Sequence, residues 1–330
     1  MMEKPYLLFL GDAPDQLAAK TATGIADWRP DWCVGQLRLP GCQADTGLQD
    51  VGIEEAAQHG ARTLVIGVVN AGGTMPESWS DSIVEAIGRG MDVASGLHAR
   101  LESFPAIREA AERHGRRLFN VRHSEQRFAT GKGTKRSGKR LLTVGTDCSV
   151  GKKYAALAIE REMRRRGMKA DFRATGQTGV FIAERGVAID AVVADFISGA
   201  AEWLSPDNEP DHWDVIEGQG SLFHASFAGV SLGLLHGSQP DALVLCHEPT
   251  RTHMRGLPHY PIPDVRDCIE ANVRAAYLTN PDCRMVAVAV NTRALAPDEA
   301  QLYLAKLEAE VGLPCVDPIA GEVGRIVDAL

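Results

Sequence analysis

The chain has 330 residues, which at roughly 100–200 residues per domain favours two domains over one or three. Hydrophobic residues make up 45% and charged residues 24%, close to folded-protein averages, so a disordered, collagen-like or coiled-coil chain is excluded. Lys and Arg number 35 against 43 Asp and Glu, a net charge of −8. This balance lacks the basic character of nucleic-acid-binding proteins, so we expect small ligands and no nucleic acid.

The start of the chain and its thiols indicate a compartment. Residues 1–5 show no basic segment followed by an apolar one, and no stretch reaches the ~18 apolar residues of a membrane span. The seven cysteines are scattered, without a C-x-x-C pair or a His partner at zinc-finger spacing. We therefore expect a cytoplasmic protein with reduced, mostly structural thiols and no membrane partner.

Strand and helix patterns alternate through residues 1–123. Apolar runs at residues 6–10 and 63–69 end at Gly11 and at residues 70–73, which is typical of buried strands. Helical patterns cover residues 53–59, 79–88 and 104–114, and a short strand pattern follows at 118–121. The alternation predicts a small parallel α/β layer, and the absence of G-x-G-x-x-G after the first strand gives no support for dinucleotide binding.

A basic, glycine-containing linker is predicted at residues 124–139. Residues 124–140 combine three glycines with six basic residues. Such a segment is either a solvated connection or a basic loop facing phosphate. The alternation then restarts in a second domain, residues 140–330, with strands expected at 141–144, 170–174, 214–217, 242–246 and 285–291.

The strongest motif follows the strand at residues 141–144. A glycine-containing loop precedes a helix expected at residues 154–166, in the order of a phosphate-binding loop. N–H groups at the helix start and the Lys152 ammonium would hold an anion there. The expected anion-binding residues are Gly145, Thr146, Asp147, Cys148, Ser149, Val150, Gly151, Lys152 and Lys153.

Lys153 departs from the standard pattern G-x-x-x-x-G-K-[ST]. It replaces the hydroxyl that coordinates Mg²⁺ beside a nucleoside triphosphate. At ~4 Å and an effective dielectric of ~20, each pair of like unit charges costs about 4 kcal/mol, which disfavours a divalent ion. We therefore expect no metal, and a ligand such as the pyrophosphate or 3′-phosphate of coenzyme A. A glycine turn without a ligand is the alternative.

Two further strand ends carry candidate catalytic residues. Glu217 ends an apolar strand before a flexible segment that contains Gln219 and Ser221, and its alternative role is to cap the following helix. His247 follows the strand at 242–246, and its proximity to Arg251 favours a polar ligand over a purely structural histidine. His224 and His236 flank a helix expected at 225–235 and are interpreted as structural.

Substrate-binding and nucleophilic candidates complete the site. The turn after the second strand of this domain is rich in glycine and hydroxyls, and it is either a ligand crevice or a plain strand-to-helix connection. The substrate-binding candidates are Arg173, Gln177, Thr178 and Arg251. Cys148 could serve as an acyl-accepting nucleophile, but no neighbour in the sequence is an evident base, and a small buried thiol is the alternative.

The motifs together resemble the D-glutamate N-acetyltransferase family. In the second half they are residues 145–152, 175–179, 195–196, 217–222 and 246–249, and in the first half residues 19–21, 28–30, 70–73 and 95–98. The resemblance implies an α/β protein with an N-terminal Rossmann-like domain and a C-terminal P-loop-like domain with a mostly parallel sheet. The second domain also resembles dethiobiotin synthetase, whose loop begins with the same Gly-Thr-Asp and ends Val-Gly-Lys-Thr.

The resemblance also implies the reaction, acetyl transfer from acetyl-CoA to the amine of D-glutamate in D-glutamate catabolism. In the mechanism that we expect, Glu217 or His247 takes the proton of the amine, main-chain N–H groups of residues 218–221 hold the oxyanion, and Arg173 and Arg251 pair with the substrate carboxylates. We also expect a homo-oligomer. The alternatives are an ATP-dependent ligase or kinase, with Mg²⁺ held by Asp147 and Glu217, and a non-enzymatic nucleotide- or CoA-sensing module.

Overall fold

The computed structural model describes residues 2–69 and 75–330, and it divides the chain into two compact units. The first comprises Met1–Gln126 with Gln177–Ala188, and the second comprises Arg127–Gly176 with Ile189–Leu330. The motif expected at residues 70–73 lies outside the described residues. No helix in the described ranges combines the length and the apolar character that crossing a bilayer requires.

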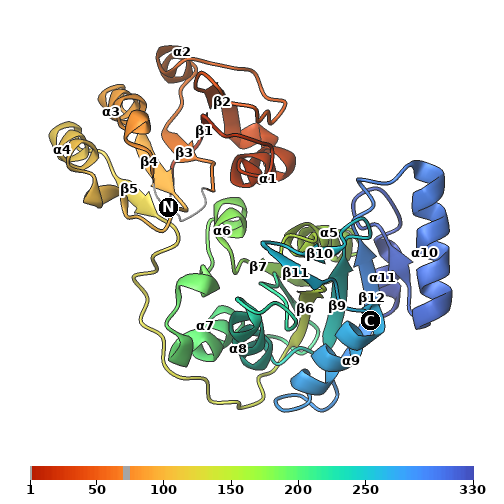
Figure 1. The fold of residues 1–330 in the computed structure, drawn as a ribbon. Coiled ribbons are helices and arrows are strands. Elements are labelled where there is room, and N and C mark those ends of the chain that lie inside the picture. Colours follow the sequence, from red (N-terminus) through yellow and green to blue (C-terminus); the bar gives the residue numbers. More distant parts are fainter. Residues whose placement is uncertain (1, 70–74) are drawn as a thin grey trace. The chain divides into compact units, whose positions relative to one another are not determined.

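The first unit is a five-stranded parallel sheet in the order β2-β1-β3-β4-β5. Helices α2, α3 and α4 pack side by side, and α1 packs against α6. The elements are β1 (Tyr6–Gly11), α1 (Lys20–Trp28), β2 (Cys33–Arg38), α2 (Ile53–Gln58), β3 (Thr63–Ile66), α3 (Ser80–Gly88), β4 (Asp92–Ser95), α4 (Pro105–His114), β5 (Leu118–Asn120) and α6 (Gln177–Ala183) (Figure 1). The expected parallel α/β layer is confirmed.

The second unit contains a six-stranded parallel sheet in the order β13-β12-β9-β6-β8-β7, and a separate β10–β11 hairpin. Its elements are β6 (Lys139–Gly145), α5 (Lys152–Arg165), β7 (Ala170–Arg173), α7 (Ile197–Leu204), β8 (Trp213–Ile216), α8 (Ala228–Ser238), β9 (Ala242–His247), β10 (His253–Met254), β11 (Leu257–Pro261), α9 (Val265–Ala276), β12 (Arg284–Val290), α10 (Pro297–Val311), β13 (Cys315–Val316) and α11 (Gly324–Asp328). All five strands predicted for this domain are present.

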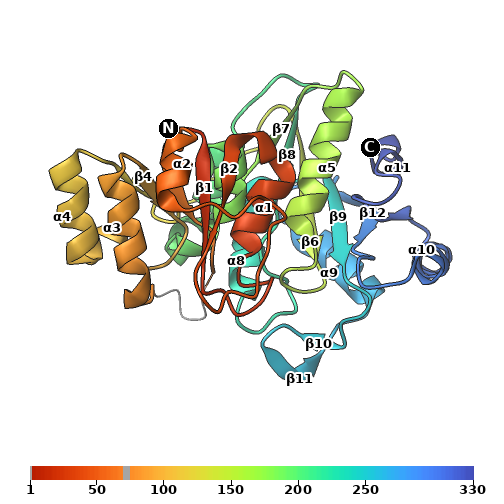
Figure 2. The same cartoon turned by 90° about the horizontal axis from the view of Figure 1, so that it is seen from above.

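Helices cover both faces of this second sheet. Helix α5 contacts β6, β7 and β8 and packs against α11, whereas α8 and α9 contact β6, β9 and β12 (Figure 2). The sheet core is formed by apolar strands, and every residue of β9 and all but the first of β6 and β12 are buried. Strand β6 is thereby fixed between β8 and β9, and the loop that follows it has a rigid base.

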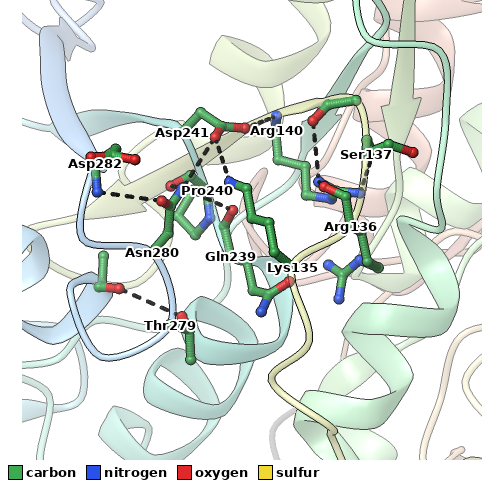
Figure 3. Close-up of polar contacts among 12 residues, drawn as sticks. Lys135, Arg136, Ser137, Arg140, Gln239, Pro240, Asp241, Thr279, Asn280 and Asp282 are labelled. Carbon is green, nitrogen blue, oxygen red and sulfur yellow. Dashed lines mark hydrogen bonds and ion pairs between the residues drawn. The ribbon is translucent and has the colours of Figure 1, made fainter.

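The basic linker is anchored to the second unit at the amino ends of its strands. Residues 127–138 contain no regular element, but Nζ of Lys135 lies 2.9 Å from Oδ1 of Asp241, and Nη2 of Arg136 donates to the carbonyl of Gly237 at 2.8 Å. Figure 3 shows Lys135, Arg140 and Asn280 converging on Asp241. Because Asp241 precedes β9, the linker lies at the sheet edge opposite the anion loop, and the phosphate-facing interpretation is wrong.

Candidate functional site

The anion loop lies between two other strand ends of the second unit. Strand β6 pairs with β8 on one side and β9 on the other, all parallel, so their carboxyl ends meet at one edge of the sheet. The loop after β6, Glu217 after β8 and His247 at the end of β9 therefore share this edge. This is where ligands bind in open α/β sheets.

The loop backbone is shaped around the Lys152 side chain. Nζ of Lys152 donates to the carbonyl of Asp147 at 2.7 Å. A Cβ atom at Gly145 would lie 2.9 Å from that Nζ, so the glycine leaves room for the ammonium group. Ser149 (φ 54°) and Gly151 (φ 108°) adopt the left-handed conformation that turns the chain into α5. Burial lowers the pKa of Lys152.

Lys153 is the second residue of α5 and lies within electrostatic reach of Glu217. Its Nζ lies 4.7 Å from the centre of the Tyr154 ring. Among the charges that lower the pKa of Glu217, that of Lys153 has the largest effect. The ammonium group thus acts on the carboxylate that was predicted to be catalytic.

Glu217 is buried, with 5% of its surface exposed, and holds the turn that follows β7. Its Oε2 accepts hydrogen bonds from the N–H groups of Thr175 at 3.1 Å and Gly176 at 3.2 Å. Burial raises the pKa of Glu217 to about 7, opposed by Lys153 and these two N–H groups. Since α8 begins only at Ala228, Glu217 does not cap that helix, and the capping alternative is wrong.

The segment after Glu217 is packed tightly against β6. The N–H of Gly218 donates to Oγ1 of Thr143 at 2.9 Å, and a Cβ there would lie 1.6 Å from the Thr143 carbonyl oxygen. Ser221 is buried and donates through Oγ to the carbonyl of Thr146 at 3.1 Å. Nε2 of Gln219 donates to Oγ1 of Thr175 at 3.2 Å. Gln219 and Ser221 therefore connect the anion loop with the turn that Glu217 holds.

His247 lies on the other side of the loop, 6% exposed. Its Nδ1 is 3.1 Å from Oγ1 of Thr146, and its Nε2 is 2.9 Å from the hydroxyl of Tyr303 on α10. Burial lowers the pKa of His247 to about 4, so the ring is neutral at pH 7.

Arg251 binds the anion loop itself. Its Nη1 donates to Oδ2 of Asp147 at 2.5 Å and to the carbonyl of Cys148 at 2.6 Å. Arg255, in the turn of the β10–β11 hairpin, adds its N–H to Oδ2 of Asp147 at 2.8 Å and its Nη1 to Oγ of Ser149 at 2.6 Å. Arg255 was not among the predicted site residues, because its contact with the loop depends on the β10–β11 hairpin, which was not among the predicted elements.

Three substrate-binding candidates are already hydrogen-bonded to other side chains. Arg173 pairs with the buried carboxylate of Asp214, with Nε 2.8 Å from Oδ1. Gln177 and Thr178 start α6, which belongs to the first unit. There Gln177 accepts a hydrogen bond from Arg122, and Oγ1 of Thr178 lies 3.0 Å from Oγ1 of Thr21. Within the second unit, Arg173 and Arg251 thus each pair with a different carboxylate.

Cys148 and two neighbours form a cluster with metal-ligand side chains. Ligand atoms of Asp147, Cys148 and His224 lie within 4.8 Å of one another among the described residues. However, Nε2 of His224 faces the carbonyl oxygen of Arg255 at 3.0 Å and must carry a hydrogen there. Asp147 is already paired with Arg251. This donor set does not fit a cation, and His224 has the structural role expected of it.

Comparisons with known proteins identify both domains. Residues 127–327 match the P-loop domain, and residues 37–124 the Rossmann-like domain, of a family described as a domain of unknown function, DUF1611. The chain belongs to this family. A DUF1611 protein of known structure from Anabaena variabilis is 30% identical, with a TM-score of 0.90 over 99% of each chain.

Two relatives carry the name D-glutamate N-acetyltransferase. One from Tritonibacter scottomollicae is 55% identical over 100% of this chain and 99% of its own. One from a Pseudoalteromonas species is 53% identical over 99% of this chain and 98% of its own. The family resemblance and the two-domain α/β fold are thus confirmed, and this DUF1611 chain is an acyltransferase rather than a sensing module.

Proposed function

We propose that this DUF1611 protein transfers the acetyl group of acetyl-CoA to the amine of D-glutamate, as a step of D-glutamate catabolism. The names of its two relatives support the acetyl group and the amino acid. The observation that carries the proposal is the carboxylate of Glu217, with a pKa of about 7, beside an anion loop whose metal-binding hydroxyl is replaced by Lys153.

The loop supplies the binding site for the coenzyme. N–H groups at the start of α5, with Lys152 and Lys153, would bind the diphosphate of acetyl-CoA. An ammonium group at position 153 neutralises phosphate charge as a metal ion would, but it repels a divalent cation. We therefore propose that binding needs no metal, which disfavours the Mg-ATP ligase or kinase alternative.

Glu217 is the better base of the two candidates. A catalytic base works best when its pKa is near the working pH, which holds for Glu217 and not for His247, whose pKa is about 4. Glu217 would take one proton from the substrate ammonium, and the free amine would attack the thioester carbon. When the C–S bond breaks, the amine nitrogen loses its second proton to the CoA sulfur, so the products are the amide, the thiol and one proton on Glu217.

The oxyanion and the substrate carboxylates have separate candidates. The N–H groups of residues 219–221 have no protein acceptor within the described part of the chain, and we propose that they hold the oxyanion. Arg173 and Arg251 already pair with carboxylates, so each would have to exchange a partner to bind substrate. Arg255 has no carboxylate partner among the described residues and is the cation most available to an anionic ligand group.

The remaining proposals concern partners. D-Glutamate is the proposed small-molecule substrate, and neither nucleic acid nor a membrane is a proposed partner. We also propose self-association into a homo-oligomer in the cytoplasm, which sedimentation of the purified protein tests.

A thiol-release assay tests the function. With acetyl-CoA, EDTA and a panel of D- and L-amino acids, we expect CoA release with D-glutamate above all others. Glu217→Gln should abolish most of this release, whereas Glu270→Gln, on an exposed position of α9, should not. Release with no amino acid, or turnover only with ATP and Mg²⁺, would contradict the proposal.

A further inference from the structure

A chain of three hydrogen-bonding side chains leads from the anion loop to helix α10. It consists of Thr146, the first loop residue, His247 at the end of β9, and Tyr303. Thr146 and His247 are buried, whereas Tyr303 is half-buried and stacks on the imidazole with ring planes 21° apart. The side chains of Thr146 and His247 therefore have no solvent with which to form hydrogen bonds.

The hydrogen bonds that join these three side chains can run in only two directions. A neutral imidazole has one N–H donor and one acceptor nitrogen, so His247 donates to one neighbour and accepts from the other. The low pKa of His247 keeps the ring neutral, and the raised pKa of Tyr303 keeps its hydroxyl protonated. Either Thr146 donates to Nδ1 and Nε2–H donates to Tyr303, or Tyr303 donates to Nε2 and Nδ1–H donates to Thr146.

The two directions differ in what the Thr146 hydroxyl offers the loop. In the first, the Thr146 hydrogen is donated to His247, and the hydroxyl can offer a ligand only its oxygen lone pairs. In the second, the Thr146 hydroxyl accepts a hydrogen bond from His247, and its own hydrogen is free to bond elsewhere. No other acceptor for this hydrogen lies in the described part of the protein. A buried hydroxyl hydrogen without an acceptor costs about 1–3 kcal/mol, so the second direction needs an acceptor supplied by a ligand.

We propose that anion binding in the loop reverses this chain, so that Tyr303 donates to His247, His247 donates to Thr146, and the Thr146 hydroxyl donates to the anion. Tyr303 is then a positioning residue that acts through His247, although it lies on a helix outside the loop. The ligand class is a phosphate ester, and the assignment to acetyl-CoA rests on the proposed function. In this arrangement His247 changes from one neutral tautomer to the other and does not accept a proton from the substrate.

Nitrogen NMR of the histidine rings tests the reversal directly. In ¹⁵N-labelled protein at pH 7.5, with the His247 signals assigned by comparison with His247→Asn, we expect Nε2–H without ligand and Nδ1–H with CoA. An unchanged wild-type tautomer at saturating CoA would overturn the proposal.

Kinetics supply a second test. Tyr303→Phe and Thr146→Val should each raise the KM for acetyl-CoA roughly 10-fold, the value of one hydrogen bond to a charged group, with kcat changed less than about twofold. The double variant should be no worse than either single one, because both break the same chain. Tyr277→Phe, on an exposed tyrosine, should match the wild type, and Thr146→Ser, which keeps the hydroxyl, should recover most of the affinity for acetyl-CoA that Thr146→Val loses.

The outcomes separate this inference from the proposed function. The double variant decides whether the two residues act through the same hydrogen bonds. If the increases in KM caused by Tyr303→Phe and Thr146→Val multiply in the double variant, the two losses are independent, and the proposal is wrong. If the wild type transfers no acetyl group to any amino acid, the proposed function fails. CoA titration and the tautomer of His247 would then still test the chain.

Discussion

Glu217 combines burial with a charge that the proposed reaction requires. In Glu217→Gln, the amide oxygen can still accept hydrogen bonds from the N–H groups of Thr175 and Gly176, but the base is lost. We expect acetyl transfer to fall by about 100-fold or more while acetyl-CoA still binds. In the wild type, kcat at saturating substrates should fall about tenfold per pH unit below pH 7, because the protonated carboxyl cannot accept a proton. A flat profile from pH 5 to 8 would exclude Glu217 as the base.

The ionisation of Glu217 should lower the free energy of unfolding at alkaline pH. The pKa of Glu217 is about 7 in the folded protein and 4.5 ordinarily, so between these values the folded state keeps a proton that the unfolded state has lost. The free energy of unfolding therefore decreases as pH rises through this window, by about 3 kcal/mol at most. Denaturant unfolding should show Glu217→Gln more stable than the wild type at pH 8 and equal to it near pH 4.5. Equal differences at both pH values would refute this linkage.

The loop and Glu217 could be predicted from the sequence, but the side chains that bind them could not. The order of strand, glycine loop and helix is local, so it could be read directly. The ion pairs of Arg251 with Asp147 and of Arg173 with Asp214 join residues 104 and 41 positions apart. Such pairings depend on the tertiary fold, and their absence from the prediction is why both arginines were assigned to substrate.

Helices α7 and α8 pack closely because α8 presents glycines to α7. A Cβ at Gly237 would lie 2.2 Å from the carbonyl oxygen of Ser198, whereas one at Gly229 would meet nothing within 4 Å. Gly237→Ala should therefore lower the free energy of unfolding by ~1–3 kcal/mol, and Gly229→Ala should raise it by about 0.5 kcal/mol. Chemical denaturation of the matched pair measures this, and two substitutions of equal effect would show that the contact does not matter.

Element prediction succeeded where apolar runs were long and missed the elements without them. Strands β6, β9 and β12 were found because nearly all their residues are buried and apolar. Strand β4 is only four residues long and starts with Asp92, a buried carboxylate that binds the N–H and side chain of Arg117. Arg117 lies 25 residues from Asp92 in the sequence. The local pattern therefore shows the charge at Asp92 but not the partner that allows it to be buried.

The path of the chain through its two units was not predicted. Residues 177–188 belong to the first unit although they follow β7 of the second. Helix α6 packs there against α1, and it buries Phe181 and Ile182. Periodicity identifies helices but does not tell which sheet a helix joins, so a simple division after the linker was the natural expectation.

This chain path makes a prediction for separated fragments. A fragment of residues 127–330 contains α6 without α1, so its apolar side chains should be exposed. We expect this fragment to bind a hydrophobic fluorescent dye, and addition of residues 1–126 to reduce the signal. A fragment that stays monomeric and binds no dye would show that α6 does not need the first unit.

Calorimetric titration of the intact protein tests whether the loop is an anion site in which Lys153 takes the place of a metal ion. Acetyl-CoA should bind equally well with EDTA and with Mg²⁺, and Lys153→Thr should weaken that binding at least about tenfold. ATP that binds only with Mg²⁺, together with acetyl-CoA that does not bind, would contradict it.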